Sequence, residues 1–600
     1  MINFNVQIRD FPFDESSQQK IESWHNGDRE YGTNWPVVYL IHNDDTKEAY
    51  IGETLNAGRR AAQHWQIQER QRLKTIHIMT DDTFNKSVIL DLEAFLIKYI
   101  SADRKYRLQN GNAGLASFDY YNRSEYEKQF HKIWNSLKEL GLVQSGIADI
   151  EDSDFFKYSP YKSLTQDQQI VLEKILFFIT GFLKQDLEYT LVIRGGAGTG
   201  KTILAVFLLK LLSDLMNRTY EKESETESAA SDLGEIHSLL AQRKMKIGFV
   251  VPQQSLRETL KKVFRTINGM SEAMIMTPRE AALAGKDEPF DLLVCDEAHR
   301  LHRREGLSQF QAFDKTNQEL GLSADASELE WLIQSSRMQL LFYDPDQSVR
   351  PSDVTQEMFE TTVSRQNKYQ LSLTSQLRCL GGSDYIQYIR NVLNAQGYVQ
   401  TNHGYGRGRA VMKEGSLTRP LNLPIPKTDF QDYRLGFYDN LDEMMDEINR
   451  LNRECGLSCA VAGYGWKWVT KDHPNDPDLK DIPIGRGYIW NRTYTDWINS
   501  ARLPNEIGCI HTVQGYDLNY VGVIFGPEII YDAHSKRIEV VKKKYMDARG
   551  KAVKDDYEAL RTYVLNIYAT LLTRGIHGAF VYVCDPELRE FLRKYFSANQ

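Results

Sequence analysis

The sequence predicts an α/β protein, in which a small α/β domain precedes two tandem domains with parallel sheets. Two observations carry this prediction. From Ser163 onward, short apolar runs that fit strands alternate with helical runs, which is typical of parallel sheets with helices on both faces. Before that point, residues 34–117 form a separate segment of short strand-like and helical runs.

Changes of pattern divide the 600 residues into five parts, in keeping with the three to five domains that this length suggests. We expect an N-terminal extension over 1–32, a small α/β domain over 33–118, a helical linker over 119–162, a first parallel-sheet domain over 163–365 and a second, with insertions, over 366–600. The strands of the first parallel sheet are predicted at 190–194, 247–251, 291–295 and 338–342, and those of the second at 371–373, 459–462, 508–510, 520–525 and 578–584. An acidic, serine-rich segment over 221–232 is predicted to be a mobile loop.

Composition argues against a membrane protein and a disulfide-rich one. Hydrophobic residues make up 42% and charged residues 26% of the chain, as in ordinary globular domains. The longest apolar run, 175–183, is too short for a membrane span, and the N-terminus lacks the pattern of a signal peptide. The six cysteines show no framework spacing. We therefore expect a cytoplasmic protein without a membrane partner.

A glycine-rich stretch lies between a strand-like run and a helical run. It reads G-x-x-x-x-G-K-T, the pattern of a loop whose backbone N–H groups cradle phosphates at a helix N-terminus. We expect it to bind ATP through Gly195, Gly196, Ala197, Gly198, Thr199, Gly200, Lys201 and Thr202. Lys201 would reach the terminal phosphates, and Thr202 would hold Mg²⁺.

Two carboxylates follow the apolar run 290–295. Asp296 would reach the Mg²⁺ ion of the ATP site, and Glu297 would orient or deprotonate the attacking water. Phosphoryl transfer depends mostly on positioning and charge neutralisation, so two acids at a strand end suffice for these roles.

Other polar residues fall at the ends of predicted elements. Gln347 is a candidate sensor of the γ-phosphate, and Arg378 and Arg574 would stabilise charge on the transferring phosphoryl group from the second domain. Gln514 would couple the cleft to a bound strand. Gln168, at the start of a helix, would read the adenine edge.

The second part of the chain resembles superfamily-1 helicases in their motifs I to VI. The stretches that carry the resemblance are, in this order, GGAGTGKT, VVPQQSL, VCDEAH, FYDPDQ, SQLRC, HTVQGYD and LLTRG. More narrowly, they are similar to the bacterial ATPase domain related to the Schlafen C-terminal helicase. The resemblance covers about 163–585. It implies two RecA-like domains that close on ATP and step along a nucleic-acid strand. Asp-Glu-Ala-His is more often seen in another helicase superfamily, and the long insertions are untypical.

A second group of polar residues lies near the N-terminus. The runs 35–41 and 48–54 predict a hairpin that brings Tyr39 close to Tyr50. Arg60 and His64 are four residues apart on one helix face. Glu93 falls on the apolar face of a later helix, where a carboxylate is costly unless it is paired or metal-bound.

Such residue types can together cleave a phosphodiester. Glu93 would hold one Mg²⁺ or Mn²⁺ ion, Arg60 would neutralise developing charge, and Tyr39 would activate water with help from His64 or Tyr50. For each tyrosine taken alone, packing in a half-buried strand remains an alternative.

Residues 34–114 or so resemble the GIY-YIG nuclease family. The resemblance rests on Val37-Val-Tyr39 and Tyr50-Ile-Gly52, followed by Arg60, His64 and Glu93. Val37 replaces the first glycine of the family. The resemblance implies that Tyr39, Tyr50, Arg60, His64 and Glu93 are functional, together with Asn110. Spacing does not decide between Asn110 and Asn112, and we prefer Asn110.

We therefore expect an ATP-dependent nucleic-acid translocase or helicase fused to a Mg²⁺-dependent endonuclease, which the resemblance associates with phage defence or DNA processing. Two alternatives stay open: a nucleic-acid-binding switch that does not cleave, and an RNA-directed enzyme. DNA is the favoured partner and RNA the other candidate, while a homo-oligomer or partner proteins remain open. Since the net charge is −8, nucleic acid would have to bind at local basic patches.

Overall fold

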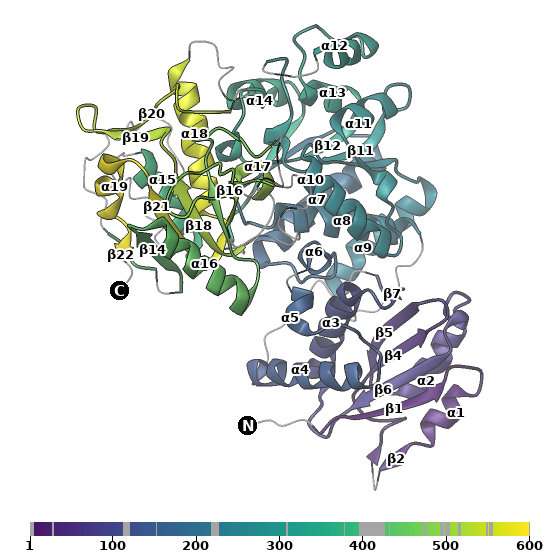
Figure 1. Ribbon diagram of the computed structural model, residues 1–600. Helices are drawn as coiled ribbons and strands as arrows, with labels where there is room; N and C mark the ends of the chain where they lie inside the picture. Colours follow the sequence, from purple (N-terminus) through teal and green to yellow (C-terminus); the bar gives the residue numbers. More distant parts are fainter. Residues whose placement is uncertain are drawn as a thin grey trace, which may run out of the picture.

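In the computed structural model, three α/β units follow one another along the chain (Figure 1). The structure describes the following residues: 5–26, 29–111, 121–151, 153–217, 227–305, 307, 310–376, 379–394, 427–430, 432–471, 473, 476, 478–492, 497, 505–513, 518–547, 550 and 556–598. The predicted α/β class with two parallel sheets is confirmed. Among these residues, no helix is long and apolar enough to cross a membrane.

The N-terminal unit is built on a five-stranded sheet in the order β1-β6-β4-β5-β7. Its strands are β1 (Gln7–Pro12), β4 (Val37–Asn43), β5 (Glu48–Thr54), β6 (Thr75–Thr80) and β7 (Arg107–Leu108), and β2 (His25–Asn26) pairs with β3 (Arg29–Glu30) beside it. Residues 1–32 are therefore not a separate extension, because β1 pairs with β6 along its whole length. Alternation in β1 is weak, which hid this edge strand from the sequence.

Helices cover both faces of this sheet. On one face, α1 (Ser17–Glu22) and α2 (Ala57–Trp65) pack against side chains such as Val37, Tyr39 and Tyr50. On the other face, α3 (Lys86–Asp103) packs against Val38, Leu40 and Ile51. The alternation of side chains along β4 separates the two cores.

The expected linker is part of the N-terminal unit's second core. It forms α4 (Arg123–Glu139), α5 (Ile147–Glu151) and α6 (Asp154–Lys157). As the sequence predicted, α4 buries Phe130, Ile133, Trp134 and Leu137 on one side, and these residues join the cluster around α3.

The first parallel sheet has the order β10-β9-β11-β12-β8-β13. Its strands are β8 (Thr190–Gly195), β9 (Ile247–Val250), β10 (Ile275–Met276), β11 (Phe290–Cys295), β12 (Ser336–Tyr343) and β13 (Lys368–Leu373). The predicted strand at 371–373 belongs to this sheet and not to the second one, since β13 runs parallel to β8 at the edge. The first domain therefore extends past the expected boundary at 365.

The helices of this domain are α7 (Gln166–Gln185), α8 (Lys201–Met216), α9 (Glu227–Gln242), α10 (Gln254–Thr266), α11 (Pro278–Ala284), α12 (Phe310–Glu319), α13 (Glu328–Gln334) and α14 (Gln356–Ser364). Its short 3₁₀ turns are η2 (Glu272–Met274), η3 (Ala298–Arg300) and η4 (Pro345–Gln347), while η1 (Arg70–Arg72) belongs to the N-terminal unit. The expected loop over 221–232 is helical from Glu227, because α9 continues into Leu233, Ile236 and Leu240, which are buried.

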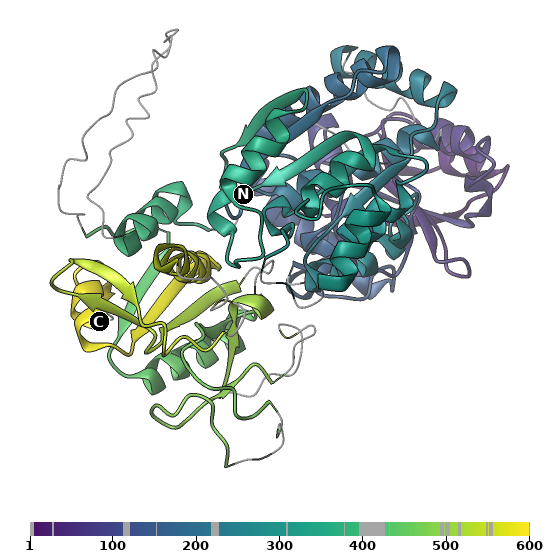
Figure 2. The same ribbon diagram turned by 90° about the horizontal axis from the view of Figure 1, so that it is seen from above.

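The second parallel sheet has the order β16-β17-β15-β18-β21-β14-β22. Its strands are β14 (Arg434–Tyr438), β15 (Cys459–Ala462), β16 (Ile489–Trp490), β17 (Glu506–Cys509), β18 (Leu518–Phe525), β21 (Gly575–Val583) and β22 (Ser597–Ala598), and an inserted hairpin consists of β19 (Ile529–Asp532) and β20 (Arg537–Val540). The helices are α15 (Gly382–Asn394), α16 (Leu441–Cys455), α17 (Ile510–Val513), α18 (Tyr557–Leu572) and α19 (Pro586–Arg593). Seen from above, the two parallel-sheet domains lie side by side (Figure 2).

Two candidate active sites

The glycine-rich loop connects β8 to α8, as the sequence predicted. Gly198 and Gly200 have φ angles of 82° and 77°, a conformation that glycine adopts without strain. The Lys201 ammonium donates hydrogen bonds to the carbonyl oxygens of Gly195 and Gly196, at 2.7 and 2.9 Å. The loop therefore places a lysine and a helix N-terminus at one point, which is the arrangement that binds phosphates.

The predicted acids lie at the same end of the sheet. The Thr202 hydroxyl donates to Asp296 Oδ2 at 2.5 Å. Burial, and then the charge of Glu297, raise the pKa of Asp296 above its usual range. A hydroxyl and a carboxylate are oxygen ligands of the kind that Mg²⁺ prefers, so the residues present fit a metal ion held between Thr202 and Asp296.

Glu297 stands beside His299, whose Nε2 atom is 3.0 Å from Glu297 Oε2. Burial alone would raise the pKa of Glu297, but the neighbouring His299, and then Lys201, hold it below its usual range. Glu297 is therefore ionised at neutral pH, as a group that accepts a proton from water must be.

A chain of polar contacts crosses from the phosphate loop to the second parallel-sheet domain. Lys201 Nζ lies 3.7 Å from Asp344 Oδ2, and that oxygen accepts a hydrogen bond of 2.6 Å from Gln347 Nε2. Arg574 Nη2 in turn donates to Gln347 Oε1 at 3.3 Å. The structure thus places Gln347 in direct contact with Arg574, and Asp344, which the sequence analysis missed although it lies in FYDPDQ, links Gln347 to Lys201.

Gln168 braces the phosphate loop from α7. Its amide donates to the Thr199 carbonyl at 3.2 Å and accepts from the Thr165 backbone N–H at 3.0 Å, so both ends of the side chain are used within the protein. Gln376, after β13, donates to the Ala197 carbonyl at 2.6 Å. The adenine-reading role of Gln168 stays a prediction. Arg378, Gln514 and Asn112 lie outside the described residues.

At the N-terminal site, the hairpin of β4 and β5 pairs Tyr39 with Gly52. A Cβ atom at Gly52 would lie 2.1 Å from the Tyr39 hydroxyl, so only glycine leaves room for this ring. The hydroxyl forms a hydrogen bond of 2.6 Å with His64 Nε2 and accepts one of 3.4 Å from Arg60 Nε. The structure therefore brings Tyr39, Arg60 and His64 together.

Tyr50 and a further arginine complete this group. The centroids of the Tyr39 and Tyr50 rings are 6.4 Å apart. The Arg70 guanidinium lies over the Tyr50 ring at 3.7 Å and hydrogen-bonds His64 Nδ1. Arg70 was missed by the sequence analysis, because it belongs to a short 3₁₀ turn whose charged residues, Arg70-Gln-Arg72, look like ordinary surface residues.

The other two predicted residues have different positions. Glu93 is half-buried on α3, the helix that covers the opposite face of the sheet from Tyr39. Asn110 is buried, and its amide bonds both backbone groups of Ile51, at 3.0 and 2.7 Å. Asn110 therefore fastens the chain after β7 to the strand that carries Tyr50.

Within the described part of the chain, no three or more His, Cys, Asp or Glu side chains gather as a metal site. Mg²⁺ commonly binds proteins through one or two carboxylates plus the phosphates of a substrate. Glu93 is the carboxylate that the sequence assigns to this role, and a single carboxylate is compatible with this mode of binding, although α3 covers the sheet face opposite to Tyr39.

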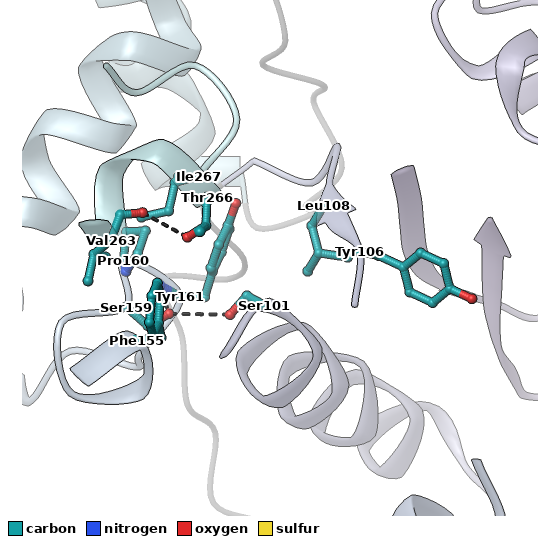
Figure 3. Close-up of a pocket in the computed structure, with 10 residues that line it drawn as sticks. All are labelled: Ser101, Tyr106, Leu108, Phe155, Ser159, Pro160, Tyr161, Val263, Thr266 and Ile267. Carbon is teal, nitrogen blue, oxygen red and sulfur yellow. Dashed lines mark hydrogen bonds between the residues drawn. The ribbon is translucent and has the colours of Figure 1, made fainter. Parts of the chain in front are cut away.

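A narrow cavity marks the junction between the N-terminal unit and the first parallel-sheet domain (Figure 3). The Ser101 and Ser159 hydroxyls face each other there at 3.4 Å. Nearby, Tyr161 donates to the Asn110 carbonyl at 3.4 Å, and Lys210 lies 5.9 Å from the Tyr161 ring and pairs with Asp214. The C-terminal part of α8, the helix that begins at the phosphate loop, therefore lies beside Tyr161, which in turn bonds Asn110.

A model of one protein family, described as Schlafen group 3, DNA/RNA helicase domain, matches residues 188–585. The uncharacterized protein YPL245W of Saccharomyces cerevisiae (strain ATCC 204508 / S288c) is 24% identical over 456 residues, which are 72% of this chain and 90% of that protein.

Two solved structures show weaker similarity. A Bacteroides Pif1 helicase in complex with ADP-AlF3 and ssDNA is 12% identical, with 70% of this chain and 92% of that chain covered, at a TM-score of 0.21. AMPPCP-bound DnaA from Aquifex aeolicus is 16% identical, with 40% of this chain covered, at a TM-score of 0.18. The match spans about half of DnaA, 55% of its chain.

Proposed function

Because this chain belongs to the Schlafen group 3 DNA/RNA helicase-domain family, and so is a helicase-like ATPase, we propose that it is a nucleic-acid translocase or helicase coupled to an N-terminal endonuclease. The contact between Thr202 and Asp296 at the phosphate loop is the observation that carries the motor half of this proposal. DNA is the favoured substrate, RNA is the other candidate, and phage defence or DNA processing is the proposed setting.

In the motor, Lys201 and the backbone N–H groups of the loop bind the terminal phosphates of ATP. Glu297 takes a proton from the attacking water, whose oxygen bonds the γ-phosphorus as the bond to the bridging oxygen breaks. A Mg²⁺ ion held by Thr202 and Asp296 would neutralise charge on the phosphates. Arg574 stabilises the transferring group from the second domain, so turnover depends on how the two domains meet.

In the N-terminal unit, the Tyr39 hydroxyl, in its ionised phenolate form, takes a proton from a water molecule that attacks the phosphodiester, while Arg60 neutralises charge on the phosphate. Glu93, together with the phosphate of the substrate, would hold Mg²⁺, which polarises the phosphorus and steadies the leaving oxygen. The compact group of Tyr39, Arg60 and His64 supports this role.

A second candidate function is a switch that binds nucleic acid without cutting it. One observation favours it: Glu93 lies on α3, which covers the sheet face opposite to Tyr39. In that case ATP turnover would remodel nucleic acid, and the N-terminal unit would only hold it.

Steady-state ATP hydrolysis, measured with and without single-stranded DNA or RNA, tests the motor. We expect nucleic acid to stimulate turnover in the wild type, and Lys201→Ala to abolish it, because the lysine would contact the phosphates that carry the developing charge. Lys74→Ala is the matched control, since that lysine is exposed on the N-terminal unit. Turnover by Lys201→Ala at the wild-type rate would rule out this ATP site.

A further inference from the structure

Three polar side chains from three different elements meet on the face of the N-terminal sheet that α1 and α2 cover. Tyr39 comes from β4, His64 from α2 and Arg70 from η1. They are almost completely buried, with exposed fractions of 1%, 1% and 6%. A buried arginine must be fixed by partners, so the contacts of Arg70 indicate what it does.

The contact of Arg70 decides which ring nitrogen of His64 carries a proton. Arg70 Nη1 hydrogen-bonds His64 Nδ1, and a guanidinium N–H can only donate, so Nδ1 accepts. Burial, followed by the charges of Arg70 and Arg60, lowers the pKa of His64 to about 2. The imidazole is therefore neutral, and its single proton lies on Nε2.

That proton determines the direction of the next hydrogen bond. His64 Nε2 lies 2.6 Å from the Tyr39 hydroxyl oxygen, so Nε2–H donates to it. Arg60 Nε donates to the same oxygen at 3.4 Å. Two donors that converge on a phenolic oxygen favour its charged form. The opposite tautomer of His64 would accept a hydrogen bond from Tyr39 and would favour the neutral phenol.

Tyr50 holds Arg70 in place. The guanidinium carbon is 3.7 Å from the centroid of the Tyr50 ring, within the range of a cation–π contact. The Tyr50 and His64 rings are 4.8 Å apart. Tyr50 thus serves as a platform for the arginine that orients His64.

We propose that Arg70 is a positioning residue, which fixes His64 in the Nε2–H tautomer and so prepares the Tyr39 oxygen to receive the proton of the attacking water. The inference rests on the proposed nuclease function. In the step itself, Tyr39 starts as the phenolate, having released its own proton to solvent; a water O–H bond breaks, and its proton passes to the phenolate oxygen to restore the phenol. The water oxygen bonds to phosphorus, and the leaving oxygen keeps the electron pair of the broken ester bond.

Nitrogen NMR of protein with ¹⁵N-labelled histidine rings tests the tautomer without any cleavage assay. Loss of one ring signal in His64→Gln assigns the residue. We expect the Nε2–H pattern for His64 in the wild type and in Arg70→Lys, which keeps a donor, and a shift toward Nδ1–H in Arg70→Met. An Nδ1–H pattern in the wild type, or an unchanged pattern in folded Arg70→Met, would overturn the inference.

The dependence of cleavage rate on pH tests the consequence for Tyr39. At neutral pH, Arg70→Met should cut about a hundredfold more slowly than the wild type, the size of a typical acid–base contribution, and its rate should begin to rise only at higher pH. Arg70→Lys should recover most of the rate. Arg72→Met is the matched control, because that side chain lies in the same turn but is 58% exposed.

The two measurements separate the two proposals. A wild-type protein that cuts neither DNA nor RNA contradicts the nuclease function, while the ring-nitrogen signals still decide whether Arg70 sets the tautomer. A wild type that cuts, with an unchanged pH profile in Arg70→Met, contradicts the role of Arg70 alone.

Discussion

Arg574 is the residue that joins the second parallel-sheet domain to the nucleotide site. It is 1% exposed, lies just after α18, and its guanidinium reaches Gln347 on the first domain. A charged group placed across a domain boundary senses the phosphoryl group only when the domains are closed. The contact with Gln347 therefore indicates how ATP and domain closure are linked.

Arg574→Ala should lower ATP turnover by about a thousandfold if this guanidinium stabilises the transferring phosphoryl group. Binding of ATP, measured separately, should change much less, because Lys201 and the loop remain. Arg574→Lys keeps the charge but loses the planar fork, so it should recover only part of the rate. Near-normal turnover in Arg574→Ala would exclude this role.

The site residues that could be predicted from the sequence are those that belong to a short local motif with a known chemical role. Lys201, Thr202 and Asp296 belong to this class, because a glycine-rich turn before a helix and an acid after an apolar strand leave few other arrangements. Arg70 and Asp344 were missed as site residues because their roles depend on contacts that spacing does not reveal: Arg70 reaches back to His64 from a separate turn, and Asp344 lies near Lys201 far along the chain.

At the level of elements, the turn after β18 places a carboxylate where water does not reach. Glu528 is 0% exposed and accepts a hydrogen bond of 2.5 Å from Tyr568. Cβ atoms at Gly465 and Gly526 would each lie 2.1 Å from one of its oxygens, so glycines make the room for it. Burial raises the pKa of Glu528 to about 7, although the hydrogen bond from Tyr568 acts in the opposite direction.

This raised pKa predicts a pH-dependent stability. The unfolded carboxyl group titrates near its ordinary pKa of 4.5. Because the folded group keeps its proton to higher pH, the free energy of unfolding falls as pH rises from about 4.5 to about 7. Glu528→Gln cannot ionise, so it should be more stable than the wild type at pH 8, on the order of 3 kcal/mol, but not at pH 4. Denaturant unfolding at both pH values measures this difference, and an equal difference at both would contradict it.

The strands of the parallel sheets were predictable because buried parallel strands are short and apolar, with helices between them. The sheet to which β13 belongs was not predictable, because the apolar residues of an edge strand do not indicate which strand it pairs with. The side of the N-terminal sheet that each helix covers is likewise a tertiary property. For this reason the sequence could place Glu93 on a helix but not on the opposite face from Tyr39.

In the whole molecule, α8 runs from the nucleotide site to the junction with the N-terminal unit. It begins at Lys201 and ends beside the N-terminal unit, where Lys210 and Asp214 pair with side-chain exposures of 1% and 5%. Arg107 in β7 also donates to the Ile267 carbonyl after α10, at 3.4 Å. The Arg107 contact joins the N-terminal unit to the motor, and the buried pair lies within α8 at the same junction, beside Tyr161.

Removal of one partner of the buried Lys210–Asp214 pair in α8 should destabilise the protein. Asp214→Ala leaves the Lys210 ammonium buried without its partner, which costs about 3 to 5 kcal/mol, and the midpoint of denaturant unfolding should fall accordingly. Asp45→Ala is the control. Asp45 pairs with Lys74, and their side chains are 76% and 64% exposed; such exposed pairs contribute at most about 1 kcal/mol to stability. Equal effects of the two substitutions would contradict a structural role for the buried pair.

Cleavage of matched single- and double-stranded DNA and RNA, with Mg²⁺ and with or without ATP, tests most directly whether one chain carries both a motor and a nuclease. The wild type, Lys201→Ala and Glu93→Gln should be compared, with ATP hydrolysis measured in the same samples. We expect Glu93→Gln to lose cleavage but keep ATP hydrolysis, and Lys201→Ala to lose ATP hydrolysis and any effect of ATP on cutting. Cleavage by Glu93→Gln at the wild-type rate, or no cleavage by the wild type on any substrate, would contradict the account.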